Sequence, residues 1–290
     1  MENSLLCAAA PGKINLYLKV TGKRPNGYHE LESLFLPLAG VADDVAIDCD
    51  AMPGGITVGC SDIMIPGGTS NIAGKAAELW AKKCGHVPHW DINIVKNIPV
   101  AAGMGGGSSD AAAVLKLLND NYGNPLSNKE LSEAALELGA DVPYFLDARA
   151  AIMSGIGEVA APLEFEVPVM NILLLAPQFP VTAAEGYRLM LPEKISGMDE
   201  NLRKDILCAL QANDPEKLGK LIFNDLQQGV FNKYPILEML ADEISANGAL
   251  SVQMTGSGPT LFALFGDRKT MLQAQEFLQQ NHRDFRVFTA

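Results

Sequence analysis

One segment governs the interpretation of the whole sequence: residues 99–110 read PVAAGMGGGSSD. Its glycines stand at four positions, Gly103, Gly105, Gly106 and Gly107. Without β-carbons, backbone N–H groups can converge on a bound oxyanion. Ser108 and Ser109 then offer capping oxygens before the helix-forming run 111–115, so we expect the glycines to lie directly before a helix N-terminus, whose dipole favours an anion. The segment therefore predicts a phosphate-binding loop.

Two common phosphate-binding patterns do not fit this segment. No Gly-Lys-Ser/Thr ends it, which excludes the Walker pattern, and Ser108 stands where a dinucleotide fingerprint needs its third glycine. Taken alone, the glycine run is equally compatible with a flexible surface turn. Its surroundings favour a site, because an alternating strand pattern at 90–95 leads into Pro99 and a second glycine turn, residues 254–259, lies between two expected strands.

The remaining elements predict a mixed fold. Residues 14–21 alternate like a half-buried strand, residues 25–27 are typical of a turn, and the apolar run 34–38 is the expected returning strand of a hairpin. Further helices are expected at 71–84, 131–138 (with a capping box from Ser127 and Gly139 after its end), 201–211, 235–246 and 269–280, and further strands within 169–175, 250–254 and 261–265. We therefore predict an α+β fold with two domains, residues 1–160 and 161–290.

Composition narrows the classes of function. A formal net charge of −12 argues against a protein that coats nucleic acid. Five cysteines without a CxxC pair fit a reducing compartment and show no zinc site. The first seven residues lack a basic leader, and no run reaches membrane-spanning length. We expect a cytoplasmic protein that binds neither membrane nor nucleic acid.

Three motifs, taken together, resemble those of the galactokinase, homoserine kinase, mevalonate kinase and phosphomevalonate kinase (GHMP) superfamily in order and spacing. They are residues 10–16 (APGKINL), 99–109 and 254–259 (MTGSGP). Residues 22–31 and 139–146 resemble the branch of that superfamily that acts on a CDP-linked methylerythritol. The element Gly27-Tyr28-His29 separates this branch from the sugar, homoserine and mevalonate kinases.

The resemblance implies a two-domain GHMP kinase fold with the active site in the cleft between the domains. It also implies transfer of the ATP γ-phosphate, with Mg²⁺, to the 2-hydroxyl of a CDP-linked methylerythritol in non-mevalonate isoprenoid synthesis. The partner is thus a small-molecule substrate, and the oligomeric state is expected to be a monomer or a weak homodimer. The protein ligands of the metal stay unknown, although a hydroxyl of Ser108 or Ser109 is a candidate.

The same resemblance assigns residues. The catalytic pair is Lys13 and Asp141, and the ATP contacts are Asn71, Lys96, Pro99, Gly103, Gly105, Gly106, Gly107, Ser108 and Ser109. The acceptor contacts are Asn15, Tyr28, His29 and, as a second aromatic against the cytosine, Tyr187. A glycine turn near the site comprises Gly256, Ser257 and Gly258. Phosphoryl transfer needs mostly positioning and charge stabilisation, so a lysine and a carboxylate suit it.

Alternatives stay open at this stage. Taken singly, Lys13 is compatible with an ordinary exposed lysine, His29 with a structural imidazole, and residues 254–259 with a simple hairpin connection. A kinase of the same fold acting on mevalonate or homoserine is one rival, and a nucleotide-binding module without activity is another. Tyr28 and His29 argue against the first rival. The presence of both Lys13 and Asp141 argues against the second.

Overall fold

The computed structural model describes residues 5–50 and 54–290. Its chain forms two compact units. Of the described residues, unit 1 contains 5–12, 41–50, 54–100 and 105–149, and unit 2 contains 13–40, 101–104 and 150–290. The predicted domain boundary after residue 160 stays a prediction, and it does not anticipate that residues 13–40 pack with the C-terminal half of the chain.

A long hairpin opens the fold and passes through both units. Strand β1 (Leu5–Lys23) pairs with β2 (His29–Asp48). In the turn between them, the Arg24 N–H donates to the Tyr28 carbonyl at 2.7 Å and Gly27 adopts a φ of +90°. The predicted hairpin is confirmed, with strands longer than the periodicity indicated.

Unit 1 joins a small sheet to helices. Strand β4 (His89–Val95) pairs in parallel with β3 (Gly55–Cys60) and antiparallel with the end of β2. A short 3-10 turn (Gly68–Ser70) precedes four helices: α1 (Ile72–Cys84), α2 (Gly106–Asn121), α3 (Asn128–Leu138) and α4 (Val142–Phe145). The buried Trp80 ring of α1 lies edge-on to Trp90 of β4, and its Nε1 donates to Asn119 Oδ1 of α2 at 3.2 Å. These contacts hold α1, α2 and β4 together.

Unit 2 contains a second, fully antiparallel sheet. Its order is β10 (Arg286–Thr289), β7 (Asn171–Ala176), β9 (Leu261–Phe265) and β8 (Ser251–Met254). In the same unit, β5 (Ala151–Ser154) pairs with β2, as Ser33 faces Met153, and with β6 (Val159–Pro162). Its helices are α5 (Ala183–Leu189), α6 (Glu200–Gln211), α7 (Pro215–Leu221), α8 (Gln227–Lys233), α9 (Pro235–Ala246) and α10 (Arg268–Asn281), with a 3-10 turn at Pro192–Lys194.

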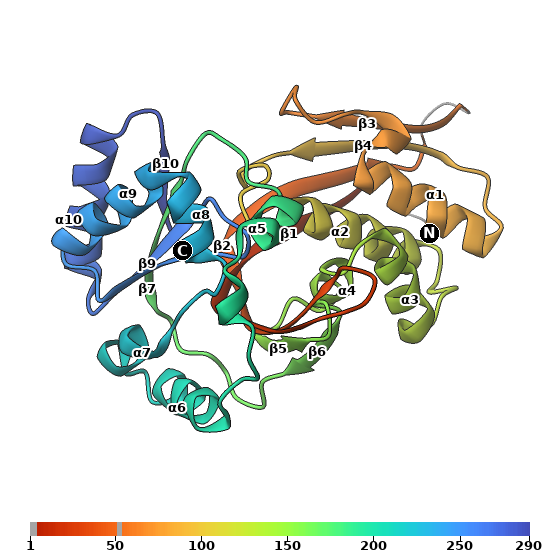
Figure 1. Cartoon of the computed structure of the whole chain (residues 1–290). Coiled ribbons are helices and arrows are strands. Elements are labelled where there is room, and N and C mark those ends of the chain that lie inside the picture. The colour runs from red at the N-terminus through yellow and green to blue at the C-terminus, as the bar shows by residue number, and fades with distance from the viewer. Residues whose placement is uncertain (1–4, 51–53) are drawn as a thin grey trace. The chain divides into compact units, whose positions relative to one another are not determined.

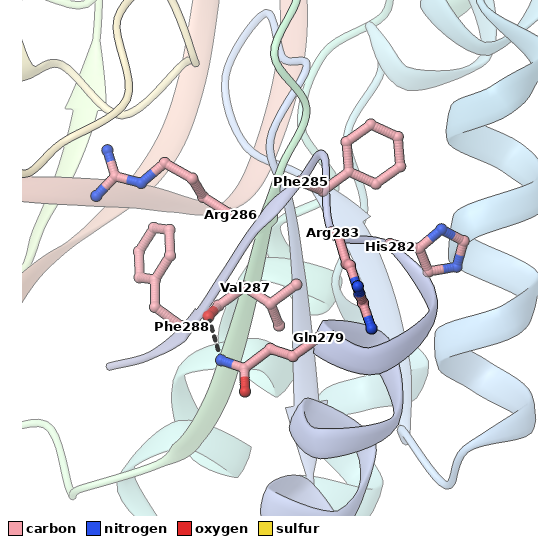
Figure 2. Close-up of a pocket in the computed structure, with 7 residues that line it drawn as sticks. All are labelled: Gln279, His282, Arg283, Phe285, Arg286, Val287 and Phe288. Carbon is pink, nitrogen blue, oxygen red and sulfur yellow. Dashed lines mark hydrogen bonds between the residues drawn. The ribbon is translucent and has the colours of Figure 1, made fainter.

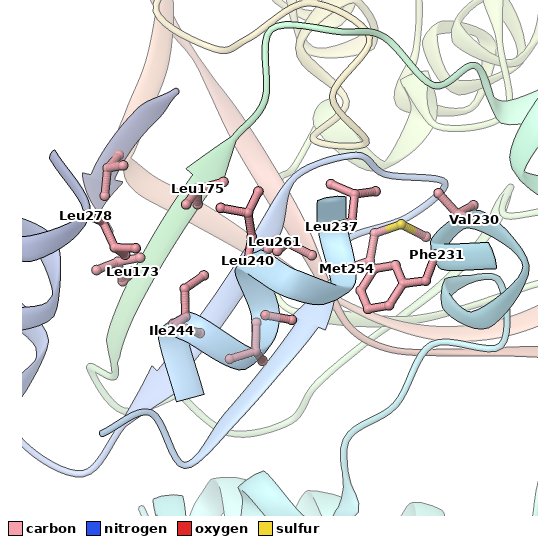
Figure 3. Close-up of a cluster of buried hydrophobic side chains, with 14 of the residues drawn as sticks. Leu173, Leu175, Val230, Phe231, Leu237, Leu240, Ile244, Met254, Leu261 and Leu278 are labelled. Carbon is pink, nitrogen blue, oxygen red and sulfur yellow. The ribbon is translucent and has the colours of Figure 1, made fainter. Parts of the chain in front are cut away.

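The core of unit 2 lies between this sheet and its helices. Helices α9 and α10 lie beside the strands (Figure 1), and they contribute Leu240 and Leu278 to the same buried cluster as Leu173 of β7. Figure 3 shows this cluster, in which α9 side chains four residues apart, Leu240 and Ile244, point to the same side. The helix expected at 235–246 is confirmed, and the four-residue spacing puts both side chains on its buried face.

The sequence predictions of the longer elements are confirmed, and the start of α2 is not. The helix begins at Gly106, and Gly105, with a φ of +74°, is its N-cap. The Ser109 N–H donates to the Gly105 carbonyl, so the serines lie in the first turn and do not cap it. A left-handed glycine ends the loop without a capping side chain, which is why the capping argument placed the helix start too late.

Two smaller points complete the comparison. The capping box of Ser127 and Glu130 is confirmed, whereas Gly139 is extended (φ 167°) and not left-handed after α3. Among the described residues, no helix is both long and apolar enough to cross a membrane. Residues 1–4 of the segment expected to lack a leader lie outside the part that the structure describes.

Replacement of a core leucine tests the packing of α10. Leu278 is 0% exposed and Leu272, on the same helix, is 43% exposed. We expect Leu278→Ala to lower the free energy of unfolding by about 2–5 kcal/mol, because it removes buried methyl groups and leaves a cavity. Leu272→Ala should cost less than about 1 kcal/mol. Urea unfolding of both variants measures this, and equal losses would contradict the described core.

Candidate functional site

Lys13 is a buried lysine and not the exposed one that its sequence context allowed. It is 3% exposed on β1. Its Nζ donates to Asn15 Oδ1 at 2.5 Å and to the carbonyl of Gly103 at 2.9 Å, and it lies 4.6 Å from the centre of the Phe35 ring. The backbone N–H of Lys13 also donates to the Met104 carbonyl at 3.0 Å. The lysine is thus fixed directly against the glycine loop.

The second glycine turn contacts the same group of residues. The Asn15 N–H donates to Thr255 Oγ1 at 3.0 Å, and Thr255 is fully buried. A β-carbon added to Gly256 would lie 3.3 Å from Lys13 Nζ and 3.0 Å from the Gly103 carbonyl oxygen. The structure therefore brings together parts of the three sequence motifs, and the turn 254–259 is more than a hairpin connection.

Gly103 needs to be glycine for two reasons. Its φ of +75° is unfavourable for other residues, and a β-carbon there would lie 2.2 Å from the carbonyl oxygen of Thr255. Any side chain would separate the loop from the second turn. The close approach of the two backbones explains this glycine independently of any ligand.

Three supporting polar residues were missed by the sequence analysis. Asn224 donates from Nδ2 to the carbonyls of Met254 and Gly256, at 2.6 and 2.8 Å, and so fixes the second turn. Asn15 donates from Nδ2 to Ser33 Oγ at 2.8 Å. The third missed residue, Thr255, lies within the motif 254–259, so the sequence could have pointed to it. Asn224 and Ser33 occur in ordinary sequence surroundings, and only tertiary contacts identify them.

The aromatic residues expected to contact a pyrimidine lie at the hairpin turn and on α5. The rings of His29 and Tyr187 are stacked, with centroids 5.2 Å apart and planes 9° apart, which brings Tyr187 of α5 to the start of β2. Tyr28 is 60% exposed. Partial burial lowers the pKa of His29 below its ordinary value of 6.5, and the Lys23 ammonium lowers it further. A neutral imidazole can donate one hydrogen bond and accept another.

The exit of the glycine loop offers backbone donors and one unusual hydroxyl. Gly106, Gly107 and Ser108 form the first turn of α2, whose N–H groups lack partners within the helix. Ser109 is buried, and among the described residues its Oγ has no hydrogen-bond partner. A buried hydroxyl without a partner beside such a helix start fits a phosphate oxygen or Mg²⁺. No group of three acidic, histidine or cysteine side chains that could hold a metal occurs in residues 5–50 and 54–290.

Lys96 belongs to a buried ion cluster. Its Nζ pairs with Asp43 Oδ2 and, at 2.6 Å, with Asp110 Oδ2. Burial raises the pKa of Asp110 to about 7, with Asp43 adding to the rise and Lys96 opposing it. Burial alone would lower the pKa of Lys96, but the two carboxylates outweigh it and raise that pKa. The contact of Lys96 with ATP stays a prediction. In the structure the Lys96 ammonium donates hydrogen bonds to Asp43 and Asp110.

Asn71 and Asp141 occupy helix starts in unit 1. Asn71 caps α1, since its Oδ1 accepts from the Ala73 N–H at 2.9 Å and its Nδ2 donates to the Pro66 carbonyl at 3.1 Å. Asp141 precedes α4, and its side chain does not cap that helix. Asp141 belongs to unit 1 and Lys13 to unit 2, so their cooperation as a catalytic pair stays a prediction.

A pocket of about 410 Å³ lies elsewhere, at the end of α10 and along β10 (Figure 2). Its lining runs from Gln279 to Phe288, and Gln279 Nε2 donates to the Val287 carbonyl at 3.0 Å. None of the predicted site residues lines it.

Comparison with known proteins identifies relatives over almost the whole chain. Residues 71–155 match the model of the GHMP kinases N terminal domain, and residues 206–284 match that of the GHMP kinases C terminal region. The 4-diphosphocytidyl-2-C-methyl-D-erythritol kinase of Geobacter sulfurreducens is 36% identical over 284 residues, covering 94% of this chain and 95% of the relative. The enzyme of that name from Clostridium kluyveri is 38% identical over 268 residues, 92% of each chain.

Solved structures agree with these relatives. A crystal structure of 4-(cytidine 5'-diphospho)-2C-methyl-D-erythritol kinase superposes with a TM-score of 0.81 at 32% identity, over 98% of both chains. The homoserine kinase of Cytophaga hutchinsonii superposes with a TM-score of 0.77 at 16% identity, over 100% of this chain and 95% of the other. At that low identity the second match shows the shared fold alone.

The raised pKa of Asp110 predicts a pH effect on stability. The folded protein holds this proton more tightly than the unfolded chain, so ionisation of Asp110 lowers the free energy of unfolding as the pH rises from about 4 to about 7. Asp110→Asn lacks this contribution. The stability of the parent minus that of the variant should therefore fall across this range and then level off.

Urea unfolding at half-unit pH steps measures the difference. Asp120→Asn, which removes an exposed carboxylate from the same helix, is the control and should give a nearly constant difference. A difference for Asp110→Asn that does not change between pH 4 and 8 would contradict the burial of its charge.

Proposed function

The chain belongs to the GHMP kinases and, within them, to the 4-diphosphocytidyl-2-C-methyl-D-erythritol kinases, and from this membership we propose its reaction. It transfers the γ-phosphate of ATP to the 2-hydroxyl of 4-diphosphocytidyl-2-C-methyl-D-erythritol, a step of the non-mevalonate isoprenoid pathway. The observation that carries this proposal is the match to enzymes of that name over nearly the full length of both chains. A cytoplasmic location and a monomeric or weakly dimeric state stay predictions.

Lys13 and Asp141 are proposed to be the catalytic residues of phosphoryl transfer. Asp141 accepts the proton of the attacking hydroxyl, while Lys13 remains charged and offsets negative charge on the phosphoryl group. The role of Lys13 is supported by the hydrogen bonds that hold its ammonium to Asn15 and the Gly103 carbonyl, since a fixed ammonium needs little reorganisation during the reaction. The support for Asp141 is that its side chain is not used to cap α4.

The triphosphate is proposed to lie on the loop Pro99–Ser109. The N–H groups at the start of α2 and the left-handed Gly105 supply donors for phosphate oxygens. The Ser109 hydroxyl, which is buried without a partner among the described residues, would contact a phosphate oxygen or Mg²⁺. When bound, Mg²⁺ would neutralise charge on the phosphates and keep mostly water and phosphate oxygens around it.

The cytosine of the acceptor is proposed to bind beside the hairpin turn. His29, largely neutral at neutral pH, offers both a donor and an acceptor to the edge of the base. Tyr187 is stacked on His29 and Tyr28, next to His29 in the chain, is exposed; these aromatic rings support the proposal because a pyrimidine can stack on such faces. Asn15 is held by Ser33 and Thr255 and would orient the acceptor only by exchanging one of these bonds.

An ADP-release assay with three candidate acceptors tests the reaction. We expect ATP-dependent turnover with 4-diphosphocytidyl-2-C-methyl-D-erythritol and at least about 100-fold lower kcat/KM with mevalonate or homoserine, because neither presents a pyrimidine to His29 and Tyr187. Preferred turnover of mevalonate or homoserine would contradict the assigned substrate. Absence of turnover with all three would favour a binding module.

Asp141→Asn tests the general base. We expect kcat to fall by about 10²–10⁴-fold, with the Kd of both substrates within about threefold of the parent, because the amide cannot accept the proton. Asp147→Asn, an exposed carboxylate paired with Arg149 a short distance along the chain, is the matched control and should retain the parental rate. Turnover of Asp141→Asn at nearly the parental rate would rule out this role.

A further inference from the structure

Asp43 lies at the entrance to the glycine loop. It is a fully buried residue of β2. Its Oδ1 accepts hydrogen bonds from the backbone N–H groups of Asn97, at 2.6 Å, and Ile98, at 2.8 Å. These are the last two residues before Pro99, so one carboxylate oxygen fixes the chain where it enters the loop.

The other oxygen of Asp43 leads to the exit of the loop. Oδ2 accepts from Lys96 Nζ, and the same ammonium donates to Asp110 Oδ2 at 2.6 Å. Asp110 lies on α2, one helical turn after its first residue, Gly106. A chain of three charged side chains therefore connects β2, the end of β4 and α2.

The start of α2 also packs directly on this connection. A β-carbon added to Gly106 would lie 3.2 Å from Asp43 Oδ2 and 3.1 Å from Ile98 Cγ2, both closer than ordinary van der Waals contact. The first residue of the helix thus has room for no side chain without a shift of Asp43 or Ile98. The entrance and the exit of the loop meet at one carboxylate.

Stability alone is a poor explanation of this arrangement. Two carboxylates share one ammonium, and their side chains are at most 6% exposed. When Asp110 is ionised, such a cluster carries a net negative charge in a buried place, and buried ion pairs seldom stabilise a fold more than apolar residues of similar volume. The raised pKa of Asp110 reflects the same strain on its charge. A geometric role for the cluster accounts for it better.

We propose that Asp43 is a positioning residue for nucleotide binding, which holds residues 97–98 and the start of α2 at a fixed separation and so aims the N–H groups of the loop. The inference rests on the proposed function in that the loop binds the triphosphate. Lys96 then acts through Asp43 and Asp110 to support the loop. Walker-type loops place a lysine on the phosphates. In this chain Lys96 instead binds Asp43 and Asp110, which contact the residues before the loop and lie on the helix after it.

Direct binding of the magnesium complex of a non-hydrolysable ATP analogue, measured by calorimetry, tests the proposal. Asp43→Ala should raise its Kd at least tenfold, because both loop ends lose their common anchor. Asp43→Asn keeps an oxygen for the two N–H groups but loses the ammonium contact, so its Kd should lie between those of the parent and of Asp43→Ala. Asp44→Ala removes the neighbouring exposed carboxylate and is the control, with a Kd within twofold of the parent.

Binding of CDP in the same samples separates positioning from general destabilisation. Its Kd should stay within twofold of the parent in every folded variant, because the predicted pyrimidine contacts lie on His29 and Tyr187. A folded Asp43→Ala protein that binds the ATP analogue with parental affinity would overturn the proposal. If Asp43→Ala does not fold, Gly106→Ala decides, since it keeps every charge but crowds Asp43 and Ile98, one of which has to shift. An unchanged Kd for the analogue would then overturn the proposal.

These measurements are independent of the assigned acceptor. Loss of analogue binding in the Asp43 variants together with no turnover of 4-diphosphocytidyl-2-C-methyl-D-erythritol by the parent would reject the proposed reaction and retain the role of Asp43. Turnover of that acceptor by the parent, together with unchanged analogue binding in the Asp43 variants, would retain the proposed reaction and reject the role of Asp43.

Discussion

The buried ammonium of Lys13 is the constraint on which the surrounding arrangement depends. A charge that is 3% exposed must be compensated by hydrogen bonds, and Asn15 and the Gly103 carbonyl provide them. Asn15 in turn requires Thr255, and Thr255 requires the second glycine turn, which Asn224 holds. Positioning one lysine therefore fixes segments that lie near the beginning, the middle and the end of the sequence.

Two separate sets of contacts hold parts of the glycine loop, and they use different chemistry. In unit 2, the Gly103 carbonyl accepts from Lys13 and its backbone touches that of Thr255. In unit 1, Asp43 binds the backbone before the loop and reaches the helix after it through Lys96. A loop rich in glycine would otherwise have high conformational entropy, and ordering it on binding would weaken affinity. These contacts preorganise the loop and reduce that loss.

The sequence predicted the long elements well because their patterns are local. The period of α9 and the turn chemistry at Gly27 depend on neighbours in sequence, and both are found as expected. The start of α2 was misplaced because a left-handed Gly105 replaced the expected serine cap. The supports Asp43, Ser33 and Asn224 were missed since nothing next to them in the chain distinguishes them, and only contacts between distant residues give them a role. The ion cluster of Lys96 was missed for the same reason.

The hydrogen bond between Asn15 and Thr255 joins residues 240 positions apart in the chain. Unit 2 is also built from three separate stretches, of which residues 13–40 are synthesised first and the β8–β9 turn almost last. During translation the first hairpin therefore emerges long before its partners, with the core residues Leu18 and Val20 still uncovered. The core of this unit is complete only once β8 and β9 have been made, and a fragment that ends before them would lack part of its own core.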